Sequence, residues 1–162
     1  MKKILSIIIL FISTTTLSAN DRNVELDKLF LELKKNIPSL SSGIAQQIWM
    51  LWSTHPTDQK LTSILDEGSR LVQDQQLNRA IDVFTEAIVL DPTWAEAWNK
   101  RATVLYMIGE FQKSQDDIDK VLELEERHFG ALAGQGMVNI QLKNYDKAKR
   151  SSYRGSQRRS CS

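Results

Sequence analysis

Apolar residues recur at helical spacing through most of this chain, and no stretch shows the strict alternation that is typical of a half-buried strand. Six apolar side chains between residues 24 and 35 predict an amphipathic helix, with Asn23 as its N-cap. A break follows at residues 37–39, and Ser41 or Ser42 is expected to begin a second helix. Residues 20–58 are therefore predicted to form a helical hairpin.

Two tryptophans, Trp49 and Trp52, lie in the second helix of this predicted hairpin. A tryptophan in a helix contributes a large apolar surface to packing. We therefore expect both to lie in the core or in the seam between helices, and not to form a platform for a ligand.

From residue 61 onward the chain repeats itself every 34 residues, over three units that span residues 61–94, 95–128 and 129–150. Each unit predicts two helices joined by a short turn, which falls near Gln75, Gly109 or Asn144. Residues of similar size and polarity occupy matching positions. These sets are Ile64, Trp98 and Leu132; Gly68, Ala102 and Gly136; Leu77, Phe111 and Tyr145; and Ala80, Ser114 and Ala148.

These positions resemble the tetratricopeptide repeat (TPR). The first unit matches its pattern at Gly68, Leu71, Ala80, Phe84, Ala87 and Pro92, and the second at Trp98, Ala102, Leu105, Ser114, Ile118 and Val121. Glu126 stands where proline is usual, and Asn139 stands at an apolar position of the partial third unit. The resemblance covers about 60% of the chain. It implies an all-α fold in which antiparallel hairpins stack as a short right-handed superhelix, an α-solenoid.

The residue types that recur have a physical reason. Small residues such as Gly68, Ala102 and Gly136 are expected to let the two helices of a hairpin approach closely, while large apolar residues fill the space between hairpins. The repeat is therefore a packing pattern and specifies no chemistry by itself. The hairpin of residues 20–58 is expected to cap the array at its N-terminal end.

In the TPR family the ligand usually lies along the inner face of the first helix of each repeat. The resemblance therefore implies a peptide groove formed by Leu65, Ser69, Val72, Asn99, Thr103, Tyr106, Met107, Met137 and Ile140. Methionine side chains adapt to varied partners, and an asparagine can hydrogen-bond a peptide backbone. The alternative is that these residues line the groove without binding anything.

One TPR subclass binds chaperone C-termini through a clamp of lysine, arginine and asparagine. Here Thr103 and Met137 stand where the clamp asparagine is expected, and Gly130 and Gly134 stand where cations are expected. The chain is therefore not expected to be a chaperone partner of that subclass.

The chain has 162 residues and a net charge of +1, which is unevenly distributed. Residues 20–146 carry 13 basic and 20 acidic side chains, whereas residues 147–162 carry six basic side chains and no acidic one. An acidic body disfavours binding to nucleic acid and to anionic membranes. Residues 151–162 are predicted to be a basic disordered tail. They are either native or the product of a frameshift near Arg150.

The N-terminus has the three parts of a secretory signal, because two lysines precede an apolar run at residues 4–12 and a small, polar stretch that ends at Ala19. The run is shorter than the about 20 residues that a helix needs to span a bilayer. Residues 1–19 are therefore predicted to be a signal peptide, cleaved after Ser18 or Ala19. Export to a bacterial periplasm is expected, with an uncleaved N-terminal anchor as the alternative.

Motifs for catalysis are scarce. Cys161 is the only cysteine, and the two histidines, His55 and His128, have no ligand at metal-binding spacing. No nucleophile, phosphate-loop or zinc-protease motif occurs. The acidic run at residues 116–126 lacks the glycine turn of a calcium loop and is expected to be a solvated helix face. We expect no enzyme activity, no cofactor and no metal site.

Three hypotheses on function follow. The first is a scaffold that binds a protein or peptide in the groove, and the second is a truncated, largely non-functional remnant of a longer TPR protein. The third is a nucleic-acid or membrane binder that acts through the basic tail, which the acidic body opposes. Self-association through an exposed face near Leu132 and Tyr145 is a further option for the partner.

Overall fold

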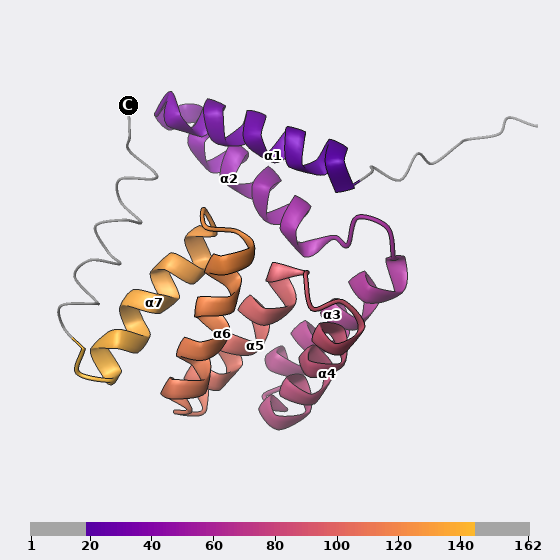
Figure 1. Cartoon of the computed structure of the whole chain (residues 1–162), viewed down its shortest axis with the longest axis vertical. Helices are drawn as coiled ribbons and strands as arrows, with labels where there is room; N and C mark the ends of the chain where they lie inside the picture. Colours follow the sequence, from indigo (N-terminus) through magenta and orange to yellow (C-terminus); the bar gives the residue numbers. More distant parts are fainter. Residues whose placement is uncertain (1–18, 145–162) are drawn as a thin grey trace, which may run out of the picture.

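The computed structural model describes residues 19–144, which contain seven α-helices and, within that range, no strand (Figure 1). The helices are α1 (Ala19–Lys34), α2 (Pro38–Ser53), α3 (Gln59–Gln73), α4 (Leu77–Leu90), α5 (Ala95–Met107), α6 (Phe111–Leu124) and α7 (Phe129–Gln141). The all-α prediction is confirmed. The predicted signal segment before Ala19, the second helix of the third unit and the basic tail lie outside the described residues.

Both expected helix starts in the first hairpin are wrong. Helix α1 begins before Asn23, which therefore lies within the helix and does not cap it. Helix α2 begins at Pro38. Proline suits the first turn of a helix, because the N–H groups there have no carbonyl of the same helix to bond, so the N–H that proline lacks costs no hydrogen bond. Ser41 lies inside this first turn, and its hydroxyl donates to the carbonyl of Ile37 at 2.9 Å.

The same turn geometry follows the first helix of each 34-residue unit. The second residue after that helix has positive φ, and the N–H of the next residue donates to a carbonyl five residues back, as in a Schellman cap. The φ values are 59° at Gln75, 84° at Gly109 and 58° at Lys143. The N–H to O distances are 2.8 Å from Gln76 to Leu71, 2.9 Å from Glu110 to Leu105, and 2.7 Å from Asn144 to Asn139.

The positive φ of this turn predicts that glycine at Gln75 stabilises the fold and that alanine at Gly109 destabilises it. Gln75→Gly is expected to raise the free energy of unfolding by about 0.5 to 1 kcal/mol, because glycine adopts positive φ without steric cost. Gly109→Ala is expected to lower it by about 1 kcal/mol. A Cβ on Gly109 would meet no atom within 4 Å, so only backbone strain is tested. Urea unfolding followed by circular dichroism measures both, and identical midpoints for the two variants would contradict the prediction.

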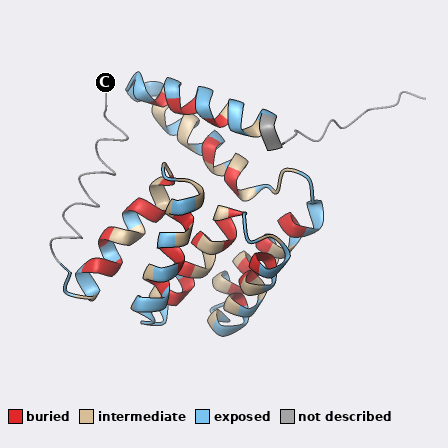
Figure 2. Ribbon diagram, in the orientation of Figure 1, coloured by how far each residue is buried: buried red, intermediate tan, exposed pale blue. Residues whose placement is uncertain are grey.

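The first repeat confirms that a small residue lets two helices meet. Phe84 of α4 is 1% exposed and lies over Gly68 of α3, where an added Cβ would lie 2.8 Å from ring atoms Cδ1 and Cζ. In the second repeat, the Ser114 hydroxyl donates to the carbonyl of Ala102 at 2.7 Å across the same kind of contact. Figure 2 shows the resulting buried faces turned toward the neighbouring helices.

The N-terminal hairpin does not cap the array as expected. Helices α3 to α7 each pack against the next, but α2 packs against α5 and against the start of α7, so the hairpin lies across the N-terminal ends of those helices (Figure 1). The close fit of Trp49 over Gly130 explains this placement, because a Cβ on Gly130 would lie 2.7 Å from Trp49 Cη2. Trp52 is 2% exposed, and its interior position is confirmed.

Candidate functional site

A cavity of about 180 Å³ lies between α5 and α7 on the face formed by the first helices of the repeats. Small residues leave room for it, among them Ala102 on α5 and Gly134 on α7. Thr103, Tyr106 and Met137 also line it, and no charged side chain does. The cavity can therefore hold an uncharged, largely apolar group, held mainly by contact with these walls.

Several of the nine predicted groove residues are accessible. Met107, Met137 and Ile140 are 46%, 50% and 53% exposed, and Thr103 is exposed beside them. Tyr106 is half-buried because its ring packs against Phe111, with ring centroids 5.4 Å apart. These five residues from α5 and α7 form the accessible part of the groove.

The predicted groove residues on α3 are less available. The Ser69 hydroxyl donates to the carbonyl of Leu65 at 2.9 Å, and Val72 packs partly against the core of the first repeat. Leu65 itself is 1% exposed and belongs to that core, so its prediction as a groove residue is corrected. The first helix of the first repeat therefore contributes little to the cavity.

Burial bears on two further sequence predictions. Asn99 is 8% exposed but lines the groove cavity, and its amide donates one hydrogen bond to the Glu96 carboxylate at 3.1 Å. Leu132 is 3% exposed and cannot belong to an exposed self-association face. Tyr145, the other residue of that predicted face, lies outside the described residues.

A buried histidine–carboxylate pair joins the start of α5 to the N-cap of α7. His128 and Glu96 are 0% and 1% exposed, and the His128 Nε2 lies 2.9 Å from Glu96 Oε2. Because His128 Nδ1 accepts the N–H of Ala131 at 3.2 Å, the ring proton is on Nε2, which donates to the carboxylate. The His128 ring also stacks on Trp52, with centroids 4.0 Å apart. The sequence analysis missed this pair because the partners are 32 residues apart and no motif links them.

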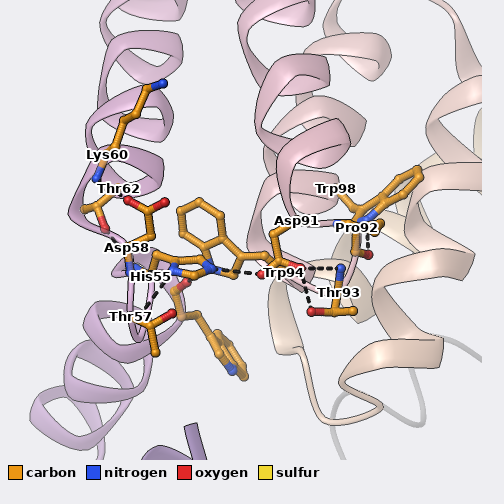
Figure 3. Close-up of polar contacts among 11 residues, drawn as sticks. His55, Thr57, Asp58, Lys60, Thr62, Asp91, Pro92, Thr93, Trp94 and Trp98 are labelled. Atoms are coloured by element: carbon orange, nitrogen blue, oxygen red, sulfur yellow. Dashed lines mark hydrogen bonds and ion pairs between the residues drawn. The ribbon is translucent and has the colours of Figure 1, made fainter. Parts of the chain in front are cut away.

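The second histidine ties two turns together (Figure 3). His55 follows α2, and its Nε2 donates to Asp91 Oδ2 at 2.8 Å, while its Nδ1 accepts the N–H of Asp58 at 2.9 Å. Asp91 Oδ1 accepts from the N–H and hydroxyl of Thr93 at 2.8 and 2.6 Å. Burial raises the pKa of Asp91, but the bonds from Thr93 and His55 more than offset it and leave the pKa below its ordinary value.

The lowered pKa of Asp91 predicts a loss of stability in acid. A carboxyl whose folded pKa lies below its unfolded pKa stabilises the fold above the unfolded value, about 3.9, and this stability is lost as pH falls through the folded pKa. We therefore expect Asp91→Asn to lower the melting temperature at pH 7 and to approach the native chain below about pH 4. Thermal melts from pH 7 to pH 3 measure this, with the exposed Asp82→Asn as the control. A difference that grows toward low pH would contradict it.

The predicted solvated acidic face is wrong at Asp117 and at Glu125, whose side chain is 13% exposed. Asp117 is 4% exposed and accepts two hydrogen bonds from Arg101, both at 2.8 Å. The Arg101 guanidinium also lies over the ring of Trp98, 5.0 Å from its centroid. Within residues 19–144 no three histidine, cysteine or acidic side chains gather closely enough to hold a metal ion.

An arginine holds the hairpin to the array. Arg127, just before α7, donates to Glu125 at 2.8 and 2.9 Å and to Asp27 of α1 at 2.6 Å. Its guanidinium lies 4.5 Å from the centroid of the Phe30 ring. The hydrogen bonds that Arg127 donates to Glu125, together with the one to Asp27, raise its pKa above the ordinary value despite partial burial.

Comparison with known proteins shows where this fold and repeat occur. No family model matches the chain. A TPR repeat-containing protein of Rhizobium etli is 36% identical over 114 residues, which are 70% of this chain and 55% of that protein. Hsp70-Hsp90 organizing protein 1 of Glycine max is 30% identical over 83 residues, which are 51% of this chain and 14% of that protein. The chain thus spans about half or less of these curated relatives.

Solved structures agree on the fold. The second TPR domain of Spaghetti (RPAP3), bound to the HSP90 peptide SRMEEVD, matches with a TM-score of 0.58 and 23% identity over 60% of this chain and 90% of that one. MamA matches with a TM-score of 0.59 and 18% identity over 87% of this chain and 80% of that one. No described helix is long and apolar enough to cross a membrane. The repeat pattern, the seven helices and these similarities together identify the chain as a TPR repeat protein.

Proposed function

We propose that this protein is a non-enzymatic scaffold that binds a peptide segment of a partner protein in the groove between α5 and α7. The cavity there carries the proposal, since uncharged side chains line it, among them the half-exposed Met137, and since the exposed Met107 and Ile140 lie on the same two helices. Exposed apolar residues that cluster beside a cavity are typical of a binding surface. A methionine-lined surface adapts to its ligand because the side chain is flexible and polarizable.

The relatives support a general role in protein interaction. The RPAP3 domain was solved with a bound HSP90 peptide, and the soybean relative is named for Hsp70 and Hsp90. That peptide, SRMEEVD, has three acidic side chains, whereas the cavity here has no cation on its walls to pair with them. We therefore propose a segment that presents an apolar side chain to the cavity and carries no acidic terminus.

A displayed peptide library tests the proposal. The native chain is expected to enrich peptides with a shared apolar residue, and Met137→Glu is expected to weaken their binding by about tenfold or more, because a charge would then enter an apolar cavity. Val89→Glu is the matched control, since Val89 is 75% exposed on α4 and away from the groove. Equal loss in both variants would overturn the groove assignment. Enrichment of no peptide would favour the remnant hypothesis.

We also propose that the chain is exported to a bacterial periplasm, on the evidence of residues 1–19. Fusion of residues 1–30 to a reporter enzyme that is active only outside the cytoplasm tests this in a bacterial host. Replacing Ile8 and Ile9 with aspartate is expected to abolish reporter activity, because it interrupts the apolar run. Activity that survives this change would overturn the proposal.

A further inference from the structure

The groove cavity between α5 and α7 has walls of two kinds. Its floor is closed by buried residues of the core of the second repeat, among them Ala102, Ile118 and Val138. Its mouth is formed by accessible residues, among them Thr103, Tyr106, Ala133 and Met137. A group that enters from solvent therefore contacts the mouth residues and is enclosed below by the apolar floor.

Glycine lines the α7 side of this cavity twice, at Gly130 and Gly134, one helical turn apart. A Cβ on Gly134 would lie 3.3 Å from Ile118 Cδ1, and a Cβ on Gly130 would lie 2.7 Å from Trp49 Cη2. Both positions thus favour glycine for packing reasons, and they present only backbone to the cavity. A wall of this kind is low and lets a flat group approach the helix closely.

The size of the cavity selects among apolar side chains. It has a volume of about 180 Å³. A cavity of about 150 Å³ with apolar walls in another protein is known to bind benzene, so the space here suits one benzene-sized ring. A leucine side chain is smaller and would leave part of the space empty, which loses contacts with the walls. A tryptophan side chain has a second fused ring and exceeds the space.

The chemistry of the mouth favours an aromatic ring over an aliphatic one. The ring of Tyr106 is held in place by Phe111, with centroids 5.4 Å apart, and aromatic rings attract one another at such distances. The thioether of Met137 makes favourable contacts with aromatic rings. The hydroxyl of Thr103 donates to the carbonyl of Asn99 at 2.9 Å, so its proton is already used within the protein.

We infer that the anchor of the bound partner is a phenylalanine side chain, whose ring enters the groove cavity beside Tyr106 and Met137. This inference rests on the proposed function, because the peptide segment of the partner supplies the ring. It narrows the ligand from any apolar side chain to one benzene-sized aromatic ring. Aromatic anchors in pockets carry much of the affinity of protein interfaces, so segments without this ring bind weakly.

N-acetylated amino-acid amides test the cavity without a known partner. The full chain is labelled with ¹³C at its methionine methyl groups and at the δ1 methyl groups of isoleucine. N-acetyl-phenylalanine amide is expected to shift the Met137 signal in a saturable way, because a nearby aromatic ring changes the chemical shift of a methyl group. Met137→Leu assigns the signal. Met50 is the internal control, since it is 62% exposed on α2 and does not line the cavity. Equal shifts of both signals would overturn the inference.

Three further amides test the size and the aromatic character of the anchor. They carry the side chains of leucine, tryptophan and cyclohexylalanine, the last of which has a ring of similar size that is not aromatic. The phenylalanine amide is expected to bind about three- to tenfold more tightly than each of them. Leucine or cyclohexylalanine that binds as tightly would overturn the aromatic preference. Tryptophan that binds as tightly would overturn the match in size.

A variant that narrows the mouth gives a second test. Ala133 is exposed on α7, so Ala133→Leu adds a side chain at the mouth without disturbing the core. It is expected to weaken binding of the phenylalanine amide by about tenfold or more. Gln46→Leu, which places the same side chain at an exposed position of α2, is the matched control and should have no effect. Equal affinities of the two variants would contradict the site.

A variant that widens the cavity tests its size directly. Met137→Ala removes a half-exposed side chain from the wall, so the fold is expected to be retained. The δ1 methyl signal of Ile118 on the floor then reports binding. We expect the preference for the phenylalanine amide over the tryptophan amide to fall by about threefold or more, because the second ring gains room. An unchanged preference would contradict the match in size.

The failure of this inference differs from the failure of the proposed function. Displayed peptides that share an aliphatic residue and lose binding with Met137→Glu would overturn the phenylalanine anchor, while the groove would remain the binding site. A library that enriches no peptide would overturn the proposed partner segment. Saturable binding of the phenylalanine amide in that case would still support the cavity as a site for an aromatic ring.

Discussion

Replacing His128 with alanine is expected to lower the free energy of unfolding by about 3–5 kcal/mol, because it leaves the buried Glu96 carboxylate without its main partner. Asn99 at 3.1 Å and Lys100 at 3.5 Å would then be the direct contacts left to that carboxylate. The change also removes the side-chain cap of α7 and the ring that stacks on Trp52. Urea unfolding followed by circular dichroism measures the loss.

Two further variants divide this loss into parts. His128→Asn retains a side-chain oxygen that can cap α7, so it is expected to cost less than alanine. Glu96→Gln combined with His128→Ala is expected to recover part of the loss, because it removes the charge that alanine leaves unpaired. A cost below about 1 kcal/mol for His128→Ala, or no recovery in the double variant, would contradict the role of this pair.

The second large effect is expected at the contact of α3 with α4. Phe84→Ala should cost about 3–5 kcal/mol, because the ring is 1% exposed and fills the centre of the first repeat. Gly68→Ala should cost about 1–3 kcal/mol in the native background, since its Cβ would overlap that ring. The same urea titration measures both.

A double variant shows whether the two residues act through one contact. In the Phe84→Leu background the smaller side chain leaves room, so Gly68→Ala is expected to cost less than it does in the native chain. Ser63→Ala, at an exposed position of α3, is the control for alanine in this helix. Additive costs for Gly68→Ala and Phe84→Leu would contradict the contact.

The N-terminal hairpin packs against the repeats and forms contacts that the repeats do not make among themselves. Trp49 and Trp52 place it against α5 and the start of α7, and Arg127 adds the ion pair to Asp27. Both histidines of the chain, and the buried donors of Arg22 and Trp52, lie at or beside this junction. Buried polar atoms without a hydrogen-bond partner therefore occur where the hairpin meets the array, at Arg22 and Trp52.

The repeats themselves were predictable from the sequence, because each of their features is local or recurs at a fixed spacing. Residue size at Gly68 and Ala102, and a turn every 34 residues at Gln75 and Gly109, are sufficient to predict two helices per unit and their close contact. The face that the first helices present was implied by the TPR resemblance, which named Met137 and Ile140 among its residues, and both are about half exposed.

The tertiary structure alone decided how the hairpin docks and which groove residues stay accessible. The TPR resemblance places Leu65 and Asn99 in the groove, but the core of the first repeat buries Leu65, and Asn99 is largely buried and donates to the Glu96 carboxylate. Burial of this kind depends on contacts between residues that are far apart in the chain. Periodicity reports which face of a helix is apolar, but it does not report which distant element covers that face. The cavity between the hairpin and the array, the His55–Asp91 pair and the stacking of Trp52 on His128 exist only because the hairpin folds back across α5 and α7.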